Sequence, residues 1–341
     1  MLAVGWGRTL PPVLAGVIGV ILAGAVLAAV HHAEVVAHRV GEPFGSLILA
    51  VAVTVIEVAL IVTLMIAGAG GVETLARDTV FAAVILTSNG IVGLSILAGT
   101  SRAAVVSFNA EGSRAALATV ATLATLGLVV PTFTTTRPGP IFSPGQLAFA
   151  AVTALTMYGL FVALQTGRHR DYFLPIATQD TAEDHATPPT AGAAGISVGL
   201  LLVSLVAVVG NAKLIAPTIE RIVEAAGLPV SVVGVVIAML ILLPETLAAV
   251  RAARRGRLQT SLNLAYGSAM ASIGLTIPAL AIASIWLPVP LHLGLDANGI
   301  VLFALTCIVS VLTVMPGRAT LLQAAVHLAL VAAYLLLAVS P

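Results

Sequence analysis

Stretches of about twenty mostly apolar residues recur along the whole chain. Charges, prolines and glycines divide it into about ten of them, near 12–30, 45–67, 79–99, 114–130, 146–166, 195–216, 229–250, 260–286, 298–314 and 319–338. A helix rises about 1.5 Å per residue, so each stretch can cross the roughly 30 Å hydrocarbon core of a bilayer. Core strands and core helices of soluble proteins are shorter. The sequence therefore predicts an all-α polytopic membrane protein.

The composition excludes several classes of function. The formal net charge of +1 gives no reason to expect a nucleic-acid partner. The single cysteine, Cys307, excludes an intramolecular disulfide and a cysteine-rich metal site. No Walker loop, nucleophile elbow or Rossmann fingerprint stands in a suitable setting, so neither ATP hydrolysis nor a cofactor is indicated.

The longest polar interval, residues 167–190, separates five spans from five. We therefore expect a first membrane repeat at 1–166, an acidic cytoplasmic hinge loop at 167–194 and a second repeat at 195–341. An odd number of spans in each half predicts two inverted five-helix repeats. A short internal similarity supports this: residues 92–95 (VGLS) in the third span resemble residues 273–276 (IGLT) in the eighth.

Positive charges favour one face of the membrane. Loops after odd-numbered spans hold ten of the fifteen basic residues: Arg39, Arg102, Arg114, Arg168, Arg170, Arg251, Arg254, Arg255, Arg257 and Arg318. The opposite face holds the other five: Arg8, Arg77, Arg137, Lys213 and Arg221. We call the first the arginine-rich face, and the positive-inside rule predicts that it is cytoplasmic, with both termini outside.

Two glutamates interrupt otherwise apolar spans. Glu57 lies in the middle of the second span, about fifteen ångströms from either end, which is the depth of the bilayer centre. An ionisable side chain there costs about 2.5 to 3.5 kcal/mol to insert and commonly marks an ion or proton pathway. Glu245 recurs in the seventh span, which predicts a duplicated, carboxylate-based ion site.

Glu57 and Glu245 together offer two negative charges and up to four oxygens. They would neutralise one divalent cation or hold two protons, and these occupants exclude one another. Such competition is the minimum requirement of an antiporter. The alternative is that each glutamate is a protonated acid bonded to a neighbouring polar helix. Pro244, directly before Glu245, either breaks its helix and exposes carbonyl ligands or only kinks it.

Small polar residues near these spans are candidate supporting ligands. Ser88 and Asn89 lie in the third span, and Ser268, Ser272 and Thr276 follow at four-residue spacing on one face of the eighth. In membrane helices such residues also mediate helix packing. Four glycines are interpreted as packing residues: Gly90, Gly93, Gly267 and Gly274.

Histidines give weaker signals. His327 in the last span is either a proton relay or, as we favour, a side chain bonded to a neighbour. A cluster between spans one and two has no zinc spacing and is interpreted as a solvated interface, with a pH-sensitive mouth as the alternative: His31, His32, Glu34, His38 and Glu42.

Residues 32–49 (HAEVVAHRVGEPFGSLIL), running into Glu57, make the chain resemble the bacterial ChaA-type calcium/proton antiporters of the cation/calcium exchanger superfamily. The resemblance continues almost to the end of the chain: Arg77-Asp78-Thr79, Asn89-Gly90, Gly93-Leu94, Pro244-Glu245, Ser261-Leu262-Asn263, Gly267-Ser268, Gly317-Arg318 and His327-Leu328-Ala329-Leu330. It implies proton-driven export of calcium by alternating access across a bacterial inner membrane. It also implies that the two acidic residues of the cation site are Glu57 and Glu245.

We therefore expect a secondary antiporter that exchanges Ca²⁺ for H⁺, with Glu57 and Glu245 as cation and proton ligands and Ser88, Asn89, Ser268 and Ser272 in support. The expected partners are cations, protons and lipid, without a cofactor. A monovalent Na⁺/H⁺ or K⁺/H⁺ antiporter is the main alternative. An intramembrane protease, whose paired acids would activate water, and a channel are more distant ones.

Overall fold

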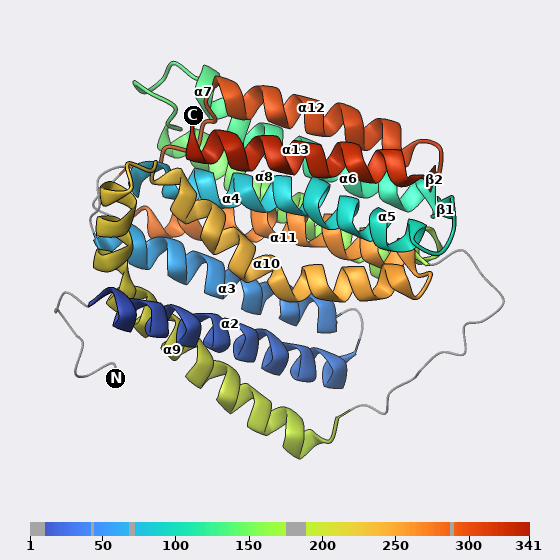
Figure 1. The fold of residues 1–341 in the computed structure, drawn as a ribbon, viewed down its shortest axis with the longest axis horizontal. Helices are drawn as coiled ribbons and strands as arrows, with labels where there is room; N and C mark the ends of the chain where they lie inside the picture. The colour runs from blue at the N-terminus through green and yellow to red at the C-terminus, as the bar shows by residue number, and fades with distance from the viewer. Residues whose placement is uncertain (1–10, 42–43, 68–71, 175–188, 287–289) are drawn as a thin grey trace.

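The computed structural model describes residues 11–41, 44–67, 72–174, 189–286 and 290–341. Within these residues ten helical spans are long and apolar enough to cross a membrane, which confirms the predicted fold class. Figure 1 shows them side by side, with their axes running between two opposite faces. The unbroken spans are α2 (Pro12–Val40), α3 (Phe44–Ala67), α8 (Pro144–Thr166), α9 (Ala191–Ala225), α10 (Ser231–Arg254), α11 (Leu258–Ala283), α12 (Ala297–Val314) and α13 (Leu321–Val339).

The third and fourth spans change their helical type along their length. The third begins with a short 3₁₀ turn and combines α4, a π-helical segment and α5; the fourth combines α6, a second π-helical segment and α7. Their bounds are η1 (Val72–Thr74), α4 (Leu75–Ile85), η2 (Leu86–Ile91), α5 (Val92–Thr100), α6 (Ala110–Ala124), η3 (Thr125–Val129) and α7 (Val130–Phe133). A π-turn inserts a residue and changes the direction of the side chains that follow, and such turns are frequent at functional sites.

The first helix is longer than predicted. The histidine cluster was expected between the first two spans, but α2 continues as one helix of 29 residues and includes His31, Glu34 and His38. No glycine or proline interrupts residues 31–40, and the chain first turns at Gly41, where φ is +76°. The placement of these residues between the two spans was therefore wrong, and Glu42 lies outside the described residues.

Helices from the two halves of the chain are interleaved. α3 packs against α11, and α10 packs against α4 and α5, so the second span of each half meets the third span of the other. α2 packs mainly against α9 and α3, and Figure 1 shows α2 and α9 together along one edge. This reciprocal pairing is the arrangement expected of inverted repeats.

At the arginine-rich face, short segments tie the halves together. Strands β1 (Val106–Ser107) and β2 (Arg318–Ala319) pair antiparallel and join the loops after the third and ninth spans. The 3₁₀ turn η4 (Arg170–Phe173) begins the expected hinge and is anchored to α11, where Asn263 donates a 2.6 Å hydrogen bond to the Phe173 carbonyl. Residues 175–188 of the expected hinge lie outside the described residues.

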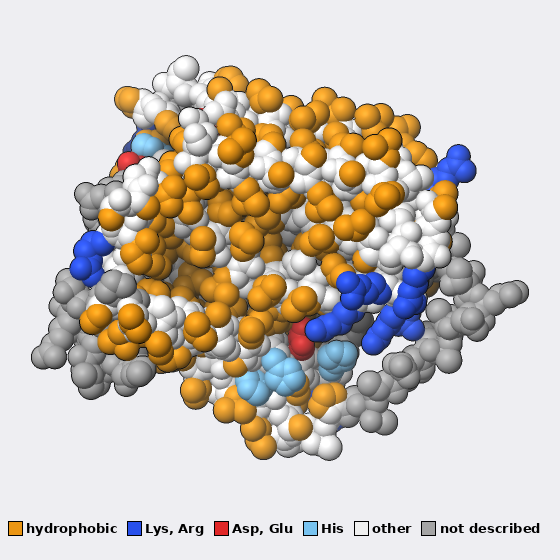
Figure 2. Space-filling model, in the orientation of Figure 1, with side chains coloured by type: hydrophobic (Ala, Val, Ile, Leu, Met, Phe, Trp, Pro, Cys, Tyr) orange, Lys and Arg blue, Asp and Glu red, His pale blue; other side chains and the backbone are white. Residues whose placement is uncertain are grey.

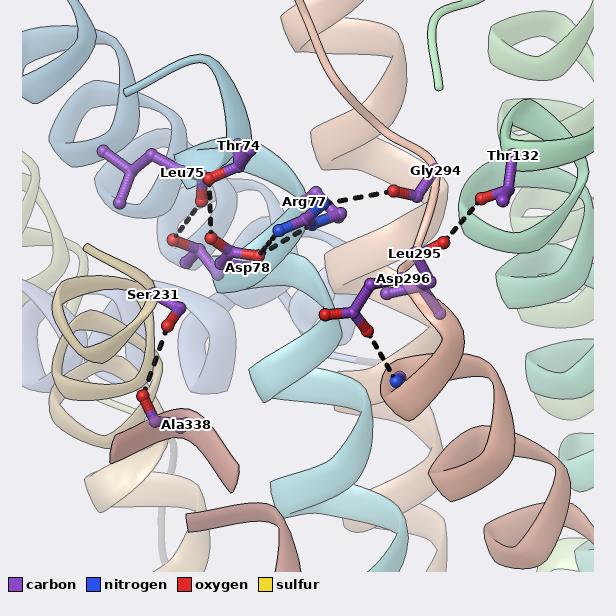
Figure 3. A network of polar contacts seen from close by, with 12 residues as sticks. Thr74, Leu75, Arg77, Asp78, Thr132, Ser231, Gly294, Leu295, Asp296 and Ala338 are labelled. Carbon is purple, nitrogen blue, oxygen red and sulfur yellow. Dashed lines mark hydrogen bonds and ion pairs between the residues drawn. The ribbon is translucent and has the colours of Figure 1, made fainter. Parts of the chain in front are cut away.

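The polar network drawn in Figure 3 lies at the opposite face. Arg77 forms a 2.7 Å ion pair with Asp78 and donates a 3.2 Å hydrogen bond to the Gly294 carbonyl. Thr132 donates a 2.7 Å bond to the neighbouring Leu295 carbonyl. These contacts connect the start of α4 with the segment before α12 and with α7, which fixes three spans at this face.

Candidate ion-binding site

Glu57 is held between two hydroxyl groups near the middle of α3. Its side chain is 3% exposed. Ser272 donates a 2.7 Å hydrogen bond to Oε1, and Thr276 donates a 2.9 Å bond to Oε2. The two donors are one turn apart on α11, so one helical face serves both oxygens. The carboxylate is thereby fixed in position and keeps lone pairs for a further ligand.

Glu245 lies on α10 in a different environment. It is 8% exposed, and within the described residues its Oε2 is buried without a hydrogen-bond partner. α10 is continuous from Ser231 to Arg254 with Pro244 inside it, so the hypothesis of a broken helix was wrong. A proline removes one backbone donor, and neighbouring turns keep the helix intact. Oε2 is therefore the oxygen of this carboxylate whose hydrogen-bonding capacity is left unsatisfied.

Both glutamates line one cavity of about 280 Å³ between α3, α8, α10 and α11. The cavity extends from Glu57 to Gln165, at the end of α8, and to Thr260, at the start of α11. Both of those helix ends lie at the arginine-rich face. The cavity therefore gives the two carboxylates a common route toward that face.

The structure places the predicted supporting residues in two groups. Ser268 and Ser272 line the cavity, together with Thr54, which the sequence analysis did not select. Thr54 precedes Glu57 by three residues and so shares its helical face; that spacing could have identified it. Ser88 and Asn89 are buried in η2 and are not among the described residues that line this cavity.

Asn89 belongs to a second buried polar cluster, around His327. Asn89 donates a 3.0 Å hydrogen bond to Thr306 and lies 2.9 Å from Nδ1 of His327. Nε2 of His327 lies 3.1 Å from the hydroxyl of Thr313. The cluster is consistent with an Nδ1–H tautomer that donates to the Asn89 carbonyl oxygen and accepts from Thr313. His327 is fully buried, and its bonded neighbours agree with the interpretation as a satisfied core side chain.

Ten membrane-crossing helices in interleaved halves, with two buried carboxylates in one cavity, define a polytopic ion transporter. Residues 10–167 and 196–340 match the family described as sodium/calcium exchanger protein. The chain belongs to this family and thus to the cation/calcium exchanger superfamily. It is therefore an ion exchanger and not an enzyme, its transported cations are substrates, and no cofactor is required.

Two relatives extend the match over nearly the whole chain. The chain is 47% identical to the putative ionic transporter y4hA of Sinorhizobium fredii over 324 residues, covering 94% of this chain and 87% of the relative. It is 34% identical to the sodium-potassium/proton antiporter ChaA of Escherichia coli over 339 residues, covering 97% and 91%.

Solved structures agree on the fold. Native YfkE superposes with a TM-score of 0.69 at 18% identity, covering 93% of this chain and 89% of that one. The H⁺/Ca²⁺ exchanger CAX superposes with a TM-score of 0.68 at 17% identity, covering 98% and 84%. At these identities the likeness concerns the fold alone.

Proposed function

We propose that the protein exchanges Ca²⁺ for H⁺ by alternating access, with Glu57 and Glu245 as the shared binding site. One observation carries the proposal: the two carboxylates, 188 positions apart in the sequence, line the same buried cavity. Two negative charges in a poorly solvated place require positive partners. One calcium ion or two protons would supply equal charge.

The cavity offers oxygen ligands of the kind that calcium prefers. Calcium takes six to eight hard oxygens, and the two carboxylates provide up to four. Hydroxyls of Thr54, Ser268 and Ser272 lie in the lining of the same cavity, and water would complete the shell. Because Ser272 donates to Glu57, its oxygen remains free to accept or to coordinate.

Exchange follows from competition for these oxygens. With the cavity open to the arginine-rich face, protons leave the carboxylates and the cation takes their place. With the site open to the opposite face, protons bind and displace the cation. We propose that the arginine-rich face is cytoplasmic in a bacterial inner membrane and both termini are outside, with repeats at 1–166 and 195–341 moving about the hinge at 167–194.

A monovalent cation is the second candidate, because the ChaA relative that covers 97% of this chain is named a sodium-potassium/proton antiporter. A single Na⁺ or K⁺ would leave one negative charge on the glutamate pair. One carboxyl would then keep its proton during transport. The two candidates thus differ in how many protons the cation displaces.

Proteoliposomes with a preset pH gradient and an internal pH dye test both candidates. Addition of Ca²⁺, Na⁺ or K⁺ in turn identifies which cation dissipates the gradient, and ⁴⁵Ca²⁺ uptake into inside-out vesicles measures calcium directly. We expect Ca²⁺ to dissipate the gradient at lower concentration than Na⁺ or K⁺. Dissipation by Na⁺ or K⁺ without Ca²⁺ uptake would replace the first candidate by the second. No cation-dependent proton flux would refute both.

A further inference from the structure

The end of the ion cavity nearest the arginine-rich face is lined by uncharged side chains that carry oxygen. Gln165 contributes from the last turn of α8, and Thr260 and Asn263 contribute from the first two turns of α11. Farther along α11, Ser268 and Ser272 line the same cavity. At 1.5 Å per residue, Thr260 and Ser272 are about 18 Å apart along the helix axis. The wall formed by α11 therefore carries oxygen atoms from the arginine-rich face to the buried carboxylates.

Asn263 is oriented by a chain of three hydrogen bonds. The backbone N–H of Asn109, at the N-cap of α6, donates a 2.7 Å bond to Oε1 of Gln259. Nε2 of Gln259 donates a 2.8 Å bond to Oδ1 of Asn263, and Nδ2 of Asn263 donates a 2.6 Å bond to the Phe173 carbonyl. The chain begins at a group that only donates and ends at a group that only accepts, which fixes the orientation of both carboxamides. The nitrogen of Asn263 is thus directed to η4, and Oδ1 keeps one lone pair for a further partner.

The turn that accepts the last of these bonds is itself packed in place. The ring of Phe173 contacts Phe161 of α8 edge to face, with centroids 5.5 Å apart. A Cβ at Gly112 would overlap the carbonyl oxygen of Tyr172, so η4 lies directly against α6. A ligand that is already fixed loses little conformational entropy when it binds. A cation that meets Asn263 therefore meets a preorganised oxygen.

A cation that approaches this end of the cavity meets unfavourable surroundings. Arg251 and Arg254 lie in the last turn of α10, and Arg257 directly precedes α11. Figure 2 shows basic side chains gathered over the end of α10, and the first turn of α11 adds the positive end of a helix dipole. Apolar side chains of Val162 and Leu264 also line the wall and cannot replace the water that a cation loses. An uncharged oxygen ligand at the entrance would offset part of both costs.

We propose that Asn263, together with Gln165 of α8, forms an entry site for the transported cation at this end of the cavity. The proposal rests on the cation exchange proposed above. Oδ1 of Asn263 and Oε1 of Gln165 contact the cation while it loses water and before it reaches Glu57 and Glu245. Because the entry site carries no charge, it holds the cation weakly and releases it to the carboxylates, where protons compete for the same oxygens.

Uptake measured separately from each face of the membrane tests the entry site. ⁴⁵Ca²⁺ uptake is followed in inside-out and in right-side-out membrane vesicles. Labelling of Glu111→Cys, exposed at the arginine-rich face, by an impermeant thiol reagent in a Cys307→Ser background shows which vesicles present that face. We expect Asn263→Leu to raise the KM for Ca²⁺ entering from the arginine-rich face about tenfold, the effect of one lost contact to a charged group, with kcat unchanged. The KM for Ca²⁺ entering from the opposite face should not rise, because that route does not pass Asn263.

The matched control is Asn211→Leu. Nδ2 of Asn211 donates a 2.7 Å bond to the Ala207 carbonyl within α9, and Asn211 is not among the described residues that line the cavity. The KM should therefore stay unchanged at both faces. Asn263→Gln, which keeps the carboxamide oxygen, should recover part of the affinity that Asn263→Leu loses.

Gln165→Leu is a second variant that leaves the hydrogen bonds of Asn263 intact, so it tests the entry site even where Asn263→Leu fails to fold. It should raise the KM at the arginine-rich face alone, by a smaller factor. An equal rise of KM at both faces, a fall in kcat alone, or an unchanged KM in these variants would overturn the proposal. Wild-type vesicles without Ca²⁺ uptake from either face would instead refute the proposed calcium exchange.

Discussion

The hydroxyl of Ser272 lies 2.7 Å from Oε1 of Glu57, although 215 residues separate the two in the chain. The acid of one half is thus held by a donor from the other half. Glu245, the corresponding acid, has an unpartnered Oε2 within the described residues. The two glutamates, although equivalent in the sequence pattern, therefore have different environments, with Glu57 fixed in place and Glu245 open to an exchanging ligand.

Removal of the charge on Glu57 should abolish exchange. Glu57→Gln keeps the shape of the side chain but leaves one carboxylate in the cavity, too few charges for a divalent cation. We expect cation-dependent proton flux in proteoliposomes to fall to background, while the thermal unfolding midpoint in detergent stays close to wild type. Glu111→Gln serves as the control for a lost surface charge. Robust flux in Glu57→Gln would show that the cation binds elsewhere.

The hydroxyl donors should set how well Glu57 accepts a cation. Ser272→Ala and Thr276→Val each remove a hydrogen bond to a buried charged group, an interaction worth about 1.5 to 3 kcal/mol. We expect the KM for the cation to rise about tenfold or more in each, because the charged carboxylate loses stabilisation. Ser284→Ala at the C-cap of α11, where the hydroxyl donates to the local Ala281 carbonyl, should leave KM unchanged. An unchanged KM in Ser272→Ala would contradict the assigned contact.

Competition between cation and protons predicts a steep pH dependence. As pH falls on the cavity side, protons occupy the carboxylates and the apparent KM for the cation rises; as pH rises, KM falls. Where two protons are displaced by each cation, log KM should change by about two per pH unit, and by about one where a single proton is displaced. Initial rates at several pH values measure this slope. A KM independent of pH would be incompatible with a shared site.

The sequence alone identified the main elements of the candidate site because burial of charge in a membrane is costly. Apolar runs gave the number of spans, and Glu57 and Glu245 stood out as ionisable residues within them. The four-residue spacing on the eighth span placed Ser268, Ser272 and Thr276 on one face. The structure brings that face against Glu57.

Other features depend on tertiary contacts that no local pattern encodes. The π-turn at residues 86–91 directs Asn89 toward Thr306 and His327, and helical periodicity assumes 3.6 residues per turn throughout. The extension of α2 to Val40 was missed because charged residues at the end of a span look like a loop on a hydropathy scale.

The cluster around His327 should stabilise the fold without taking part in coupling. His327→Ala would leave the Asn89 carbonyl oxygen and the Thr313 hydroxyl without their partner, at a cost of about 1 to 3 kcal/mol for each buried group. We expect a lower unfolding midpoint but a normal number of protons exchanged per cation in the protein that remains folded. His327→Gln, which keeps a donor, should be less destabilised. Loss of coupling at an unchanged midpoint would instead identify His327 as a relay.

Substitution by alanine should lower the stability of the protein at Gly274 but not at Gly267, because only Gly274 of these two α11 glycines is in tight contact with a neighbouring helix. A Cβ at Gly274 would lie 2.6 Å from Cβ of Tyr158 on α8, whereas a Cβ at Gly267 meets nothing within 4 Å. Gly274→Ala forces the two helices apart and should destabilise the protein by about 1 to 3 kcal/mol. Gly267→Ala adds helix propensity and should be neutral or stabilising by up to about 1 kcal/mol. Unfolding midpoints of the two variants in the same detergent measure the difference. Equal midpoints would mean that α8 and α11 are not packed closely at Gly274. The position of these two helices in the wall of the cavity that holds Glu57 and Glu245 would then be wrong.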